Sequence, residues 1–267
     1  MIPVGEKLGG RYFVIKAQDR EEPGLVFEVR DALSNVFHAQ LLYKTPLQGT
    51  DLDVLRRELA SLGKTPLLVT PDEIVATSQG VPCAIFKQPL PPPLADDLTP
   101  MVGMGSPEKK LQQQRALLGS FAALADELGR AAGSRTGHGA ISLAHVGAEG
   151  KGDARKCVLS GFGIEAAARL AEKKPRPAPK ADPAGLFLTL HDALDKVSAV
   201  PEGSVAARWS VLRNCAKAGD HPALTSCGAL AKFLRDALTE LEQNPVKAAP
   251  PPPAAKEAPA SADQSRK

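Results

Sequence analysis

A run of prolines constrains the fold of this chain more than any other feature. The segment PLPPPLADDLTP, Pro89 to Pro100, holds five prolines in twelve residues. Proline has no backbone N–H to donate to a strand ladder or a helix, so regular structure must stop here. Strand-like runs dominate before this break and helix-like runs after it. The sequence therefore predicts two lobes of different construction, joined by this segment.

The residues before the break alternate short β-type runs with polar turns. The runs YFVI, GLVFEV and VFHAQLLY, from Tyr12 to about Leu42, predict three antiparallel strands. A helix is expected over Asp51–Leu62, where leucines recur at helical spacing. Two more strand candidates, PLLVT with DEIVATS and then VPCAIFKQ, complete a sheet of about five strands with one helix. Residues 1–93 are thus expected to form an α+β lobe.

The residues after the break, 94–244, predict a mostly helical second lobe. Ser106 followed by Pro107 starts a long amphipathic helix that should end near Gly129 or Gly133. Two short strands are expected around HGAISLAHV and RKCVLSGFG, and three further helices follow at 183–197, 204–218 and 227–243. The tail, 245–267, is rich in Pro, Ala and Lys and predicts a disordered segment.

Composition excludes several classes of function. A net charge of +3 is too small to predict binding to nucleic acid. The four cysteines lie far apart without a paired framework, which is typical of buried thiols in a reducing cytosol, and neither they nor the scattered histidines have zinc spacing. The sequence has no signal-peptide pattern and no run of 18 apolar residues. We therefore expect a soluble cytoplasmic protein without a metal or cofactor and without membrane insertion.

The order of these elements, read with several motifs, resembles the bacterial serine/threonine protein kinase family from Gly9 to about Leu241. LGGRYFV resembles the lead into the first strand, and VFEVRDALSNVFHAQLLY resembles the next two strands. RRELASL resembles the helix that carries the ion-pair glutamate, which assigns that role to Glu58. His138-Gly139-Ala140 takes the place of His-Arg-Asp, and Gly161-Phe162-Gly163 that of Asp-Phe-Gly. The resemblance implies a two-lobed kinase-like fold.

The same resemblance places uncharged residues where the family carries its catalytic charges. The strand lysine, the loop aspartate and the magnesium-binding aspartate fall on Leu41, Ala140 and Gly161. The loop asparagine that holds a second Mg²⁺ falls on His145, an imidazole that suits Mg²⁺ less well than oxygen. Phosphoryl transfer depends on these groups, so their loss predicts an inactive member, or pseudokinase. Of the catalytic set only Glu58 is retained.

The remaining positions of the implied nucleotide cleft are also altered. The cleft would be lined by Gly24, Ala39, Phe86 and Phe162. The phosphate-covering loop becomes DREEPG, in which only Gly24 is kept and three acidic residues would repel a triphosphate. The residue whose N–H would meet adenine falls near Pro89, which has no N–H. We expect no Mg-ATP binding.

Three side chains admit two interpretations each. Glu58 is either half of an ion pair or a solvated helix carboxylate, because its lysine partner is missing. His138 is either an acid–base group or a core histidine that anchors its loop. Asp182 either caps the backbone N–H groups of the catalytic loop, as the resemblance implies, or is an ordinary helix N-cap.

The segment that takes the place of the activation segment, EAAARLAEKKPRPAPKA, has no Ser, Thr or Tyr between Ile164 and Asp182. Phosphorylation there is therefore not available. Residues 169–180 carry five cations and one anion, so they form either a solvated flexible loop or a docking strip for an acidic partner.

The leading function is a scaffold or regulatory module that binds a protein partner, which could be an active kinase. The alternative is an atypical serine/threonine kinase-like enzyme with weak nucleotide binding and residual phosphotransfer. A third interpretation treats the chain as part of a longer membrane receptor, because the Pro-rich tail resembles the linker before a membrane helix in bacterial relatives.

Overall fold

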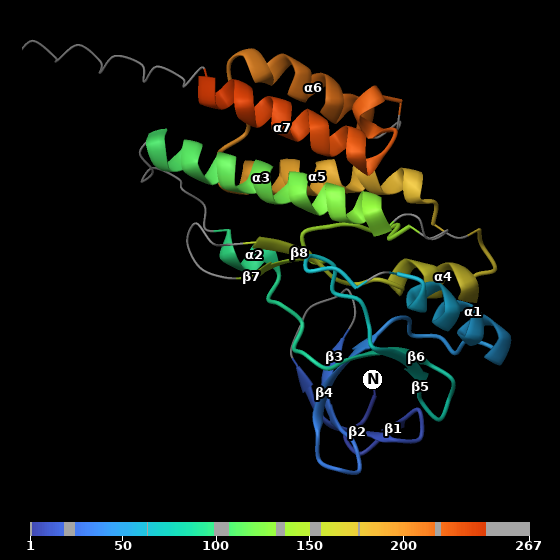
Figure 1. The fold of residues 1–267 in the computed structure, drawn as a ribbon. Helices are drawn as coiled ribbons and strands as arrows, with labels where there is room; N and C mark the ends of the chain where they lie inside the picture. Colours follow the sequence, from blue (N-terminus) through green and yellow to red (C-terminus); the bar gives the residue numbers. More distant parts are fainter. Residues whose placement is uncertain are drawn as a thin grey trace, which may run out of the picture.

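The computed structural model describes residues 2–18, 25–62, 64–98, 107–131, 137–149, 156–175, 177–216 and 220–243. The expected disordered tail, 245–267, lies outside these ranges. The two differently built lobes are observed (Figure 1), with strands gathered in one and helices in the other. The chain is therefore α+β, as its sequence predicts.

The first lobe is one antiparallel sheet with a helix on one side. Its six strands have the spatial order β1-β2-β3-β4-β6-β5. The sequence predicts about five strands, because it gives no sign of the short β1. Helix α1 follows β4 along the chain. The expected strand PLLVT forms only isolated bridges. The element bounds are β1 Lys7–Leu8, β2 Tyr12–Gln18, β3 Val26–Arg30, β4 Val36–Leu41, α1 Gly49–Ala60, β5 Glu73–Ala76 and β6 Pro82–Phe86.

The sheet curls around the N-terminal residues, so its two faces bury different cores (Figure 1). Inward side chains from all of its strands pack with Ile2 in a smaller core. Outward side chains such as Val26 and Ala84 join a larger core, which includes the buried leucines of α1 and continues into the helical lobe. Burial on both faces explains why the strand sequences are apolar without simple alternation.

The proline segment passes from β6 to a single helical turn, α2 (Leu94–Asp97), against the strand β7 (Val146–Glu149). Gly147 permits this contact, because a Cβ there would lie 2.6 Å from Cγ of Pro91. The Ala148 N–H donates to the Pro92 carbonyl at 3.2 Å. The connection between the lobes is thus held against the hairpin of β7 and β8 (Lys156–Leu159).

The second lobe is built on α3 (Pro107–Ala131), which packs against α7 (Cys227–Gln243) and α5 (Asp182–Lys196). Helix α6 (Ser204–Ala216) contributes the only tryptophan, Trp209, which is buried and donates from Nε1 to Nδ1 of His191 at 3.1 Å. Two short 3-10 helices, Pro179–Ala181 and Pro222–Leu224, precede α5 and α7.

One helix differs from the sequence prediction. Residues 164–171, where no helix is expected, form α4 (Ile164–Ala171), which packs against α1. Its last three residues begin the segment 169–180 that is interpreted from sequence as a flexible loop or docking strip. Ala, Glu, Arg and Leu all have high helix propensity, so this local sequence favours a helix once its apolar face is covered. The prolines that follow at 175, 177 and 179 end the helix.

Candidate functional site

The loop that the resemblance assigns to catalysis is anchored by a buried carboxylate. Oδ2 and Oδ1 of Asp182, in the first turn of α5, accept the N–H groups of His138 at 2.8 Å and Gly139 at 2.9 Å. Asp182 is 2% exposed, and burial raises its pKa while the two hydrogen bonds oppose that rise. Of the two interpretations of Asp182, the loop anchor is the one observed.

His138 connects this loop to the Gly-Phe-Gly turn. Its Nε2 lies 2.7 Å from the Ser160 carbonyl oxygen, and its ring meets the Phe162 ring edge to face with centroids 4.9 Å apart. Burial, and then the neighbouring His145, lowers the pKa of His138 from 6.5 to about 4. His138 is therefore a neutral, buried imidazole with these contacts. Of the two sequence interpretations, this is the core histidine that anchors its loop. Phe162 is buried in the larger core.

The place of the magnesium-binding aspartate is filled by an imidazole. Gly161 has φ +82°, and a Cβ at this position would lie 2.5 Å from Cδ2 of His145 and 3.3 Å from its Nε2. His145 is 4% exposed, and burial lowers its pKa. Its Nδ1 lies 3.1 Å from the Ser142 hydroxyl, whereas its Nε2 is buried without a hydrogen-bond partner. The space for a carboxylate at 161 is therefore occupied.

The two β4 residues assigned to the cleft, Ala39 and Leu41, are not the ones on its side of the sheet; the residue between them is. Ala39 and Leu41 of β4 point into the smaller core, away from α1. Gln40 lies opposite Val26 and Ala84, which belong to the larger core, and opposite residues of antiparallel strands share a face. Gln40 is 5% exposed, and its Oε1 has no hydrogen-bond partner. The side chain turned from β4 toward the other lobe is thus Gln40, not Leu41 or Ala39.

The other assigned residues lie as follows. Ala140 is half-buried next to the anchored loop, and its methyl group cannot accept a proton. Glu58 is half-buried on α1 and its carboxylate oxygens are shielded from solvent, so it is not a solvated helix carboxylate. Phe86 ends β6 and packs in the larger core with Phe162. Gly24 and the DREEPG loop lie outside the described residues.

The connection after β6 offers few backbone donors. The Lys87 N–H is already donated to Oδ2 of Asp72 at 2.9 Å, and prolines occupy position 89 and positions 91–93. Within the described part of the chain, no group of three or more His, Cys, Asp or Glu side chains could hold a metal ion. The residues present fit neither an adenine–hinge contact at Pro89 nor a magnesium site at Gly161.

The basic segment 169–180 is partly neutralised by its own structure. Arg169 pairs with Glu165 at 2.6 Å, Lys173 with Asp51 of α1 at 2.6 Å, and Lys174 with Glu172 at 2.6 Å. Glu172 also accepts a hydrogen bond from the Tyr43 hydroxyl at 3.2 Å. These contacts hold the end of α4 against the strand lobe, and they leave less free positive charge than the sequence predicts.

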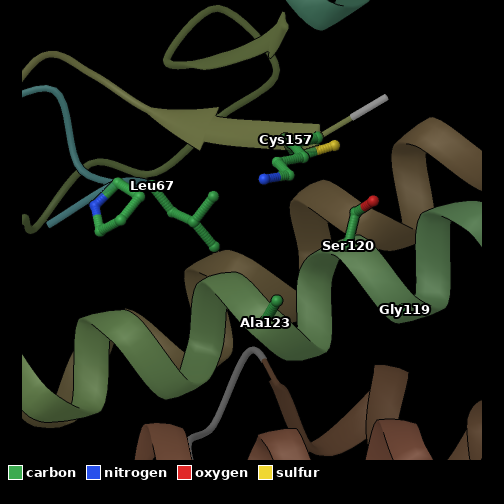
Figure 2. A pocket seen from close by; sticks show the side chains of 7 residues that line it. Leu67, Gly119, Ser120, Ala123 and Cys157 are labelled. Carbon is green, nitrogen blue, oxygen red and sulfur yellow. The ribbon is translucent and has the colours of Figure 1, made fainter. Parts of the chain in front are cut away.

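A groove of about 360 Å³ opens between α3 and β8, where Figure 2 shows Cys157 above Ser120 and Leu67 beside Ala123. The loop before β5 forms part of its wall and is joined to β8 by two backbone hydrogen bonds between Leu67, Val69 and Leu159, each 2.8 Å long. None of the residues assigned to the catalytic centre lines it. The lining residues are Pro66, Leu67, Gly119, Ser120, Ala123, Lys156 and Cys157.

No family model matches the chain, and no curated protein matches it. Among solved structures, the chain is similar to the PknI kinase domain of Mycobacterium tuberculosis, with 17% sequence identity and a TM-score of 0.62 over 89% of this chain and 100% of that one. A cysteine-to-alanine mutant of that domain is 18% identical, with a TM-score of 0.61 over 89% and 99% of the two chains. Another PknI kinase domain structure is 17% identical, with a TM-score of 0.59 over 90% and 100%.

This similarity shows the fold alone, which is that of a protein kinase domain. Among the described residues, no helix is both long and apolar enough to span a bilayer.

Proposed function

We propose that this protein kinase-like fold is catalytically inactive, does not bind Mg-ATP, and acts as a protein-binding scaffold or regulatory domain. The observation that carries the proposal is the contact between His145 and Gly161. A carboxylate at 161 is what would bring Mg²⁺ to a bound nucleotide, and a side chain there would overlap the imidazole.

Two further positions support the same conclusion. Gln40 is the residue of β4 on the side of the larger core, one position before Leu41, to which the resemblance assigns the phosphate-binding lysine. Its neutral amide supplies no positive charge. Ala140 stands where a base would accept the hydroxyl proton. A general base alone contributes about 10²- to 10⁴-fold in rate, so the joint loss of base, metal ligand and lysine removes useful transfer.

The structural contacts of the loop are nevertheless retained. Asp182 holds the loop backbone, and His138 and Phe162 remain packed together. A fold that keeps its internal supports without its charged groups can still present a fixed surface to another protein. Binding by contact therefore fits this chain better than turnover does.

The first experiment is a thermal-shift titration of the full chain with ATP, with and without Mg²⁺ or Mn²⁺. A ligand at 100 times its Kd stabilises a folded protein by about 2.7 kcal/mol. For a domain of this size, each kcal/mol raises Tm by roughly 2–4 °C. A 10 μM site would thus give a rise of roughly 5–10 °C at 1 mM ATP, whereas we expect no change.

A positive shift would favour the alternative of an atypical enzyme with weak nucleotide binding, and a matched pair of variants would locate the site. Gln40→Glu adds a negative charge on the cleft-facing side of β4, while Gln79→Glu adds the same charge at an exposed turn. A shift that Gln40→Glu removes and Gln79→Glu preserves, together with phosphate transfer to a serine/threonine peptide, would overturn the proposal.

A further inference from the structure

The exposed apolar side chains of this protein are concentrated on one lobe. Six large hydrophobic residues are exposed in the described part of the chain, and five of them lie within residues 4–36. Four lie on β2, on β4 or in the turn between β3 and β4. They are Phe13, Ile15, Leu33 and Val36, with exposed fractions of 39%, 40%, 82% and 46%. Clustered exposure of this kind marks interaction surfaces, whereas single exposed apolar residues are common.

Strand register places two of these residues, Phe13 and Val36, on one face of the sheet, whereas Ile15 lies at a register shift in β2. Tyr12 and Val14 of β2 are buried in the smaller core, so the intervening Phe13 points outward. Phe13 lies opposite Arg30 of β3, and Arg30 lies opposite Val36 of β4, so the three side chains form one row across the outer face. Two strand spacings separate Phe13 from Val36 by about 10 Å.

The helical lobe leaves this part of the sheet open. Figure 1 shows β1 and β2 at the end of the molecule farthest from α3 and α7. The same outward face of β4 is covered only farther along, where Gln40 is buried and lies opposite Val26 and Ala84 of the larger core. The exposed row is thus continuous with a face that already packs against a helix, which is how a sheet normally buries its apolar side chains.

Two cations, Lys7 and Arg30, lie at the row. Lys7 of β1 lies opposite Phe13, and its ammonium group lies 5.2 Å from the centre of the Phe13 ring. The Arg30 guanidinium group is half-exposed and lies 3.7 Å from the carboxylate of Glu28. A partner that covers Phe13 and Val36 would bring its own groups beside both cations.

We propose that the outer face formed by Phe13, Arg30 and Val36, with Lys7 at its edge, is a docking surface for an acidic amphipathic helix of a partner protein. Leucine-type residues two helical turns apart are separated by about 10.5 Å, which matches the spacing of Phe13 and Val36. Carboxylates on the flanks of such a helix would lie near Lys7 and Arg30.

Charge favours this occupant over a second copy of the chain. Two copies joined through the same patch would place Lys7 and Arg30 of one beside those of the other, and like charges repel. The proposed surface also differs from the one expected from sequence, which places an acidic partner on residues 169–180. Three of the cations in that segment already have internal partners. The inference rests on the proposed scaffold function and names its binding surface.

The test uses the full chain and a fluorescein-labelled 18-residue helical peptide with leucines spaced three and four residues apart and glutamates on both flanks. A second peptide has lysine in place of each glutamate. Fluorescence anisotropy at moderate salt should show binding of the glutamate peptide at least about tenfold tighter than binding of the lysine peptide, because rim charges of opposite sign are complementary. Backbone amide NMR shifts should map to β2, β3 and β4.

Three variants distinguish binding at the docking surface from nonspecific hydrophobic binding. Phe13→Ser should weaken peptide binding by about tenfold or more, in the range expected for loss of a central apolar contact. Val211→Ser removes a comparably exposed apolar residue from α6 and should leave binding unchanged. Arg30→Glu should reverse the preference between the two peptides. Circular dichroism would verify that each variant stays folded.

Several outcomes would overturn the inference. They are no binding of the glutamate peptide at 1 mM, equal loss of binding in Phe13→Ser and Val211→Ser, or NMR shifts confined to other elements. Self-association that Phe13→Ser removes, seen by sedimentation velocity without peptide binding, would assign the face to a second copy instead. None of these results depends on ATP, so failure here would leave the test of catalytic inactivity intact.

Discussion

Replacement of Gly161 by alanine should destabilise the protein by two separable effects. With φ +82°, the backbone at 161 is in a region that costs a residue with a Cβ about 1–3 kcal/mol. The new Cβ would also lie 2.5 Å from Cδ2 of His145. Overpacking of a buried site costs about 1–3 kcal/mol more. The expected loss in free energy of unfolding is therefore roughly 2–6 kcal/mol.

Gly203 provides a matched control, because it has φ +69° and nothing within 4 Å of a Cβ. Gly203→Ala should incur only the backbone cost, and both alanines reduce the entropy of the unfolded chain equally. The difference between the two variants isolates the contact with His145 at about 1–3 kcal/mol. Urea unfolding would be followed by far-UV circular dichroism and by the fluorescence of Trp209.

A double-mutant cycle tests the named partner. His145→Ala alone should destabilise, because it leaves a cavity in a buried region. In the background of His145→Ala, the steric part of the cost of Gly161→Ala should disappear, with a coupling energy of about 1–3 kcal/mol. If Gly161→Ala costs no more than Gly203→Ala, or if the two sites are additive, the imidazole does not fill the place of the missing carboxylate.

The other predictions concern the groups around this contact. Asp182→Ala should lower the free energy of unfolding in urea by about 3–5 kcal/mol, because it leaves one buried and one half-buried loop N–H group without an acceptor, and Asp182→Asn should cost less. The pKa of His138 is about 4 in the folded state against an ordinary value of 6.5, so between these values the unfolded chain binds a proton that the folded chain does not. The contribution of His138 to stability is present above pH 6.5 and is lost as pH falls toward 4. Its size is on the order of 3 kcal/mol. In urea unfolding, the free energy of unfolding of His138→Gln should therefore depend less on pH than that of the unsubstituted protein. Burial raises the pKa values of Cys83 and Cys227 to about 12, so a thiol reagent at pH 8 should react first with the partly exposed Cys215 in the native protein.

The sequence predicts the order of elements well where one lobe uses strands and the other uses helices. The long helix expected from Ser106 to Gly129 or Gly133 is α3, and the predicted helix over 227–243 is α7. These assignments depend on local periodicity and on the prolines. Both are local signals, because a proline interrupts a helix or strand whatever its tertiary surroundings. No helix is expected from sequence over 164–171, and residues 169–180 are interpreted as a flexible loop or docking strip. The helix propensity of the alanines in 164–171 is a local signal that could have identified α4.

The register of β4 could not be fixed from sequence for a physical reason. Ala39 and Gln40, which point to opposite faces of this strand, are both buried, so VFHAQLL lacks the alternation that would distinguish the face of the larger core from that of the smaller core. A buried glutamine is also rare, which makes Leu41 look like the better inward residue. The roles of Asp182 and His145 depend on contacts with residues distant in sequence, and no local pattern specifies those partners.

The retained and the replaced groups of the candidate site differ in the free-energy cost of their burial. Asp182 can stay buried because two N–H groups satisfy its carboxylate, and His138 can stay buried because it is neutral. A carboxylate at 161 or a lysine at 40 would be buried with no bound metal or phosphate to offset the loss of hydration, which costs several kcal/mol per ion. On the proposed function, glycine at 161 and glutamine at 40 remove that cost while the packing between the lobes is kept. Selection on such a chain acts through the stability and surface of the fold, so binding to a partner is the property by which its variants should be compared.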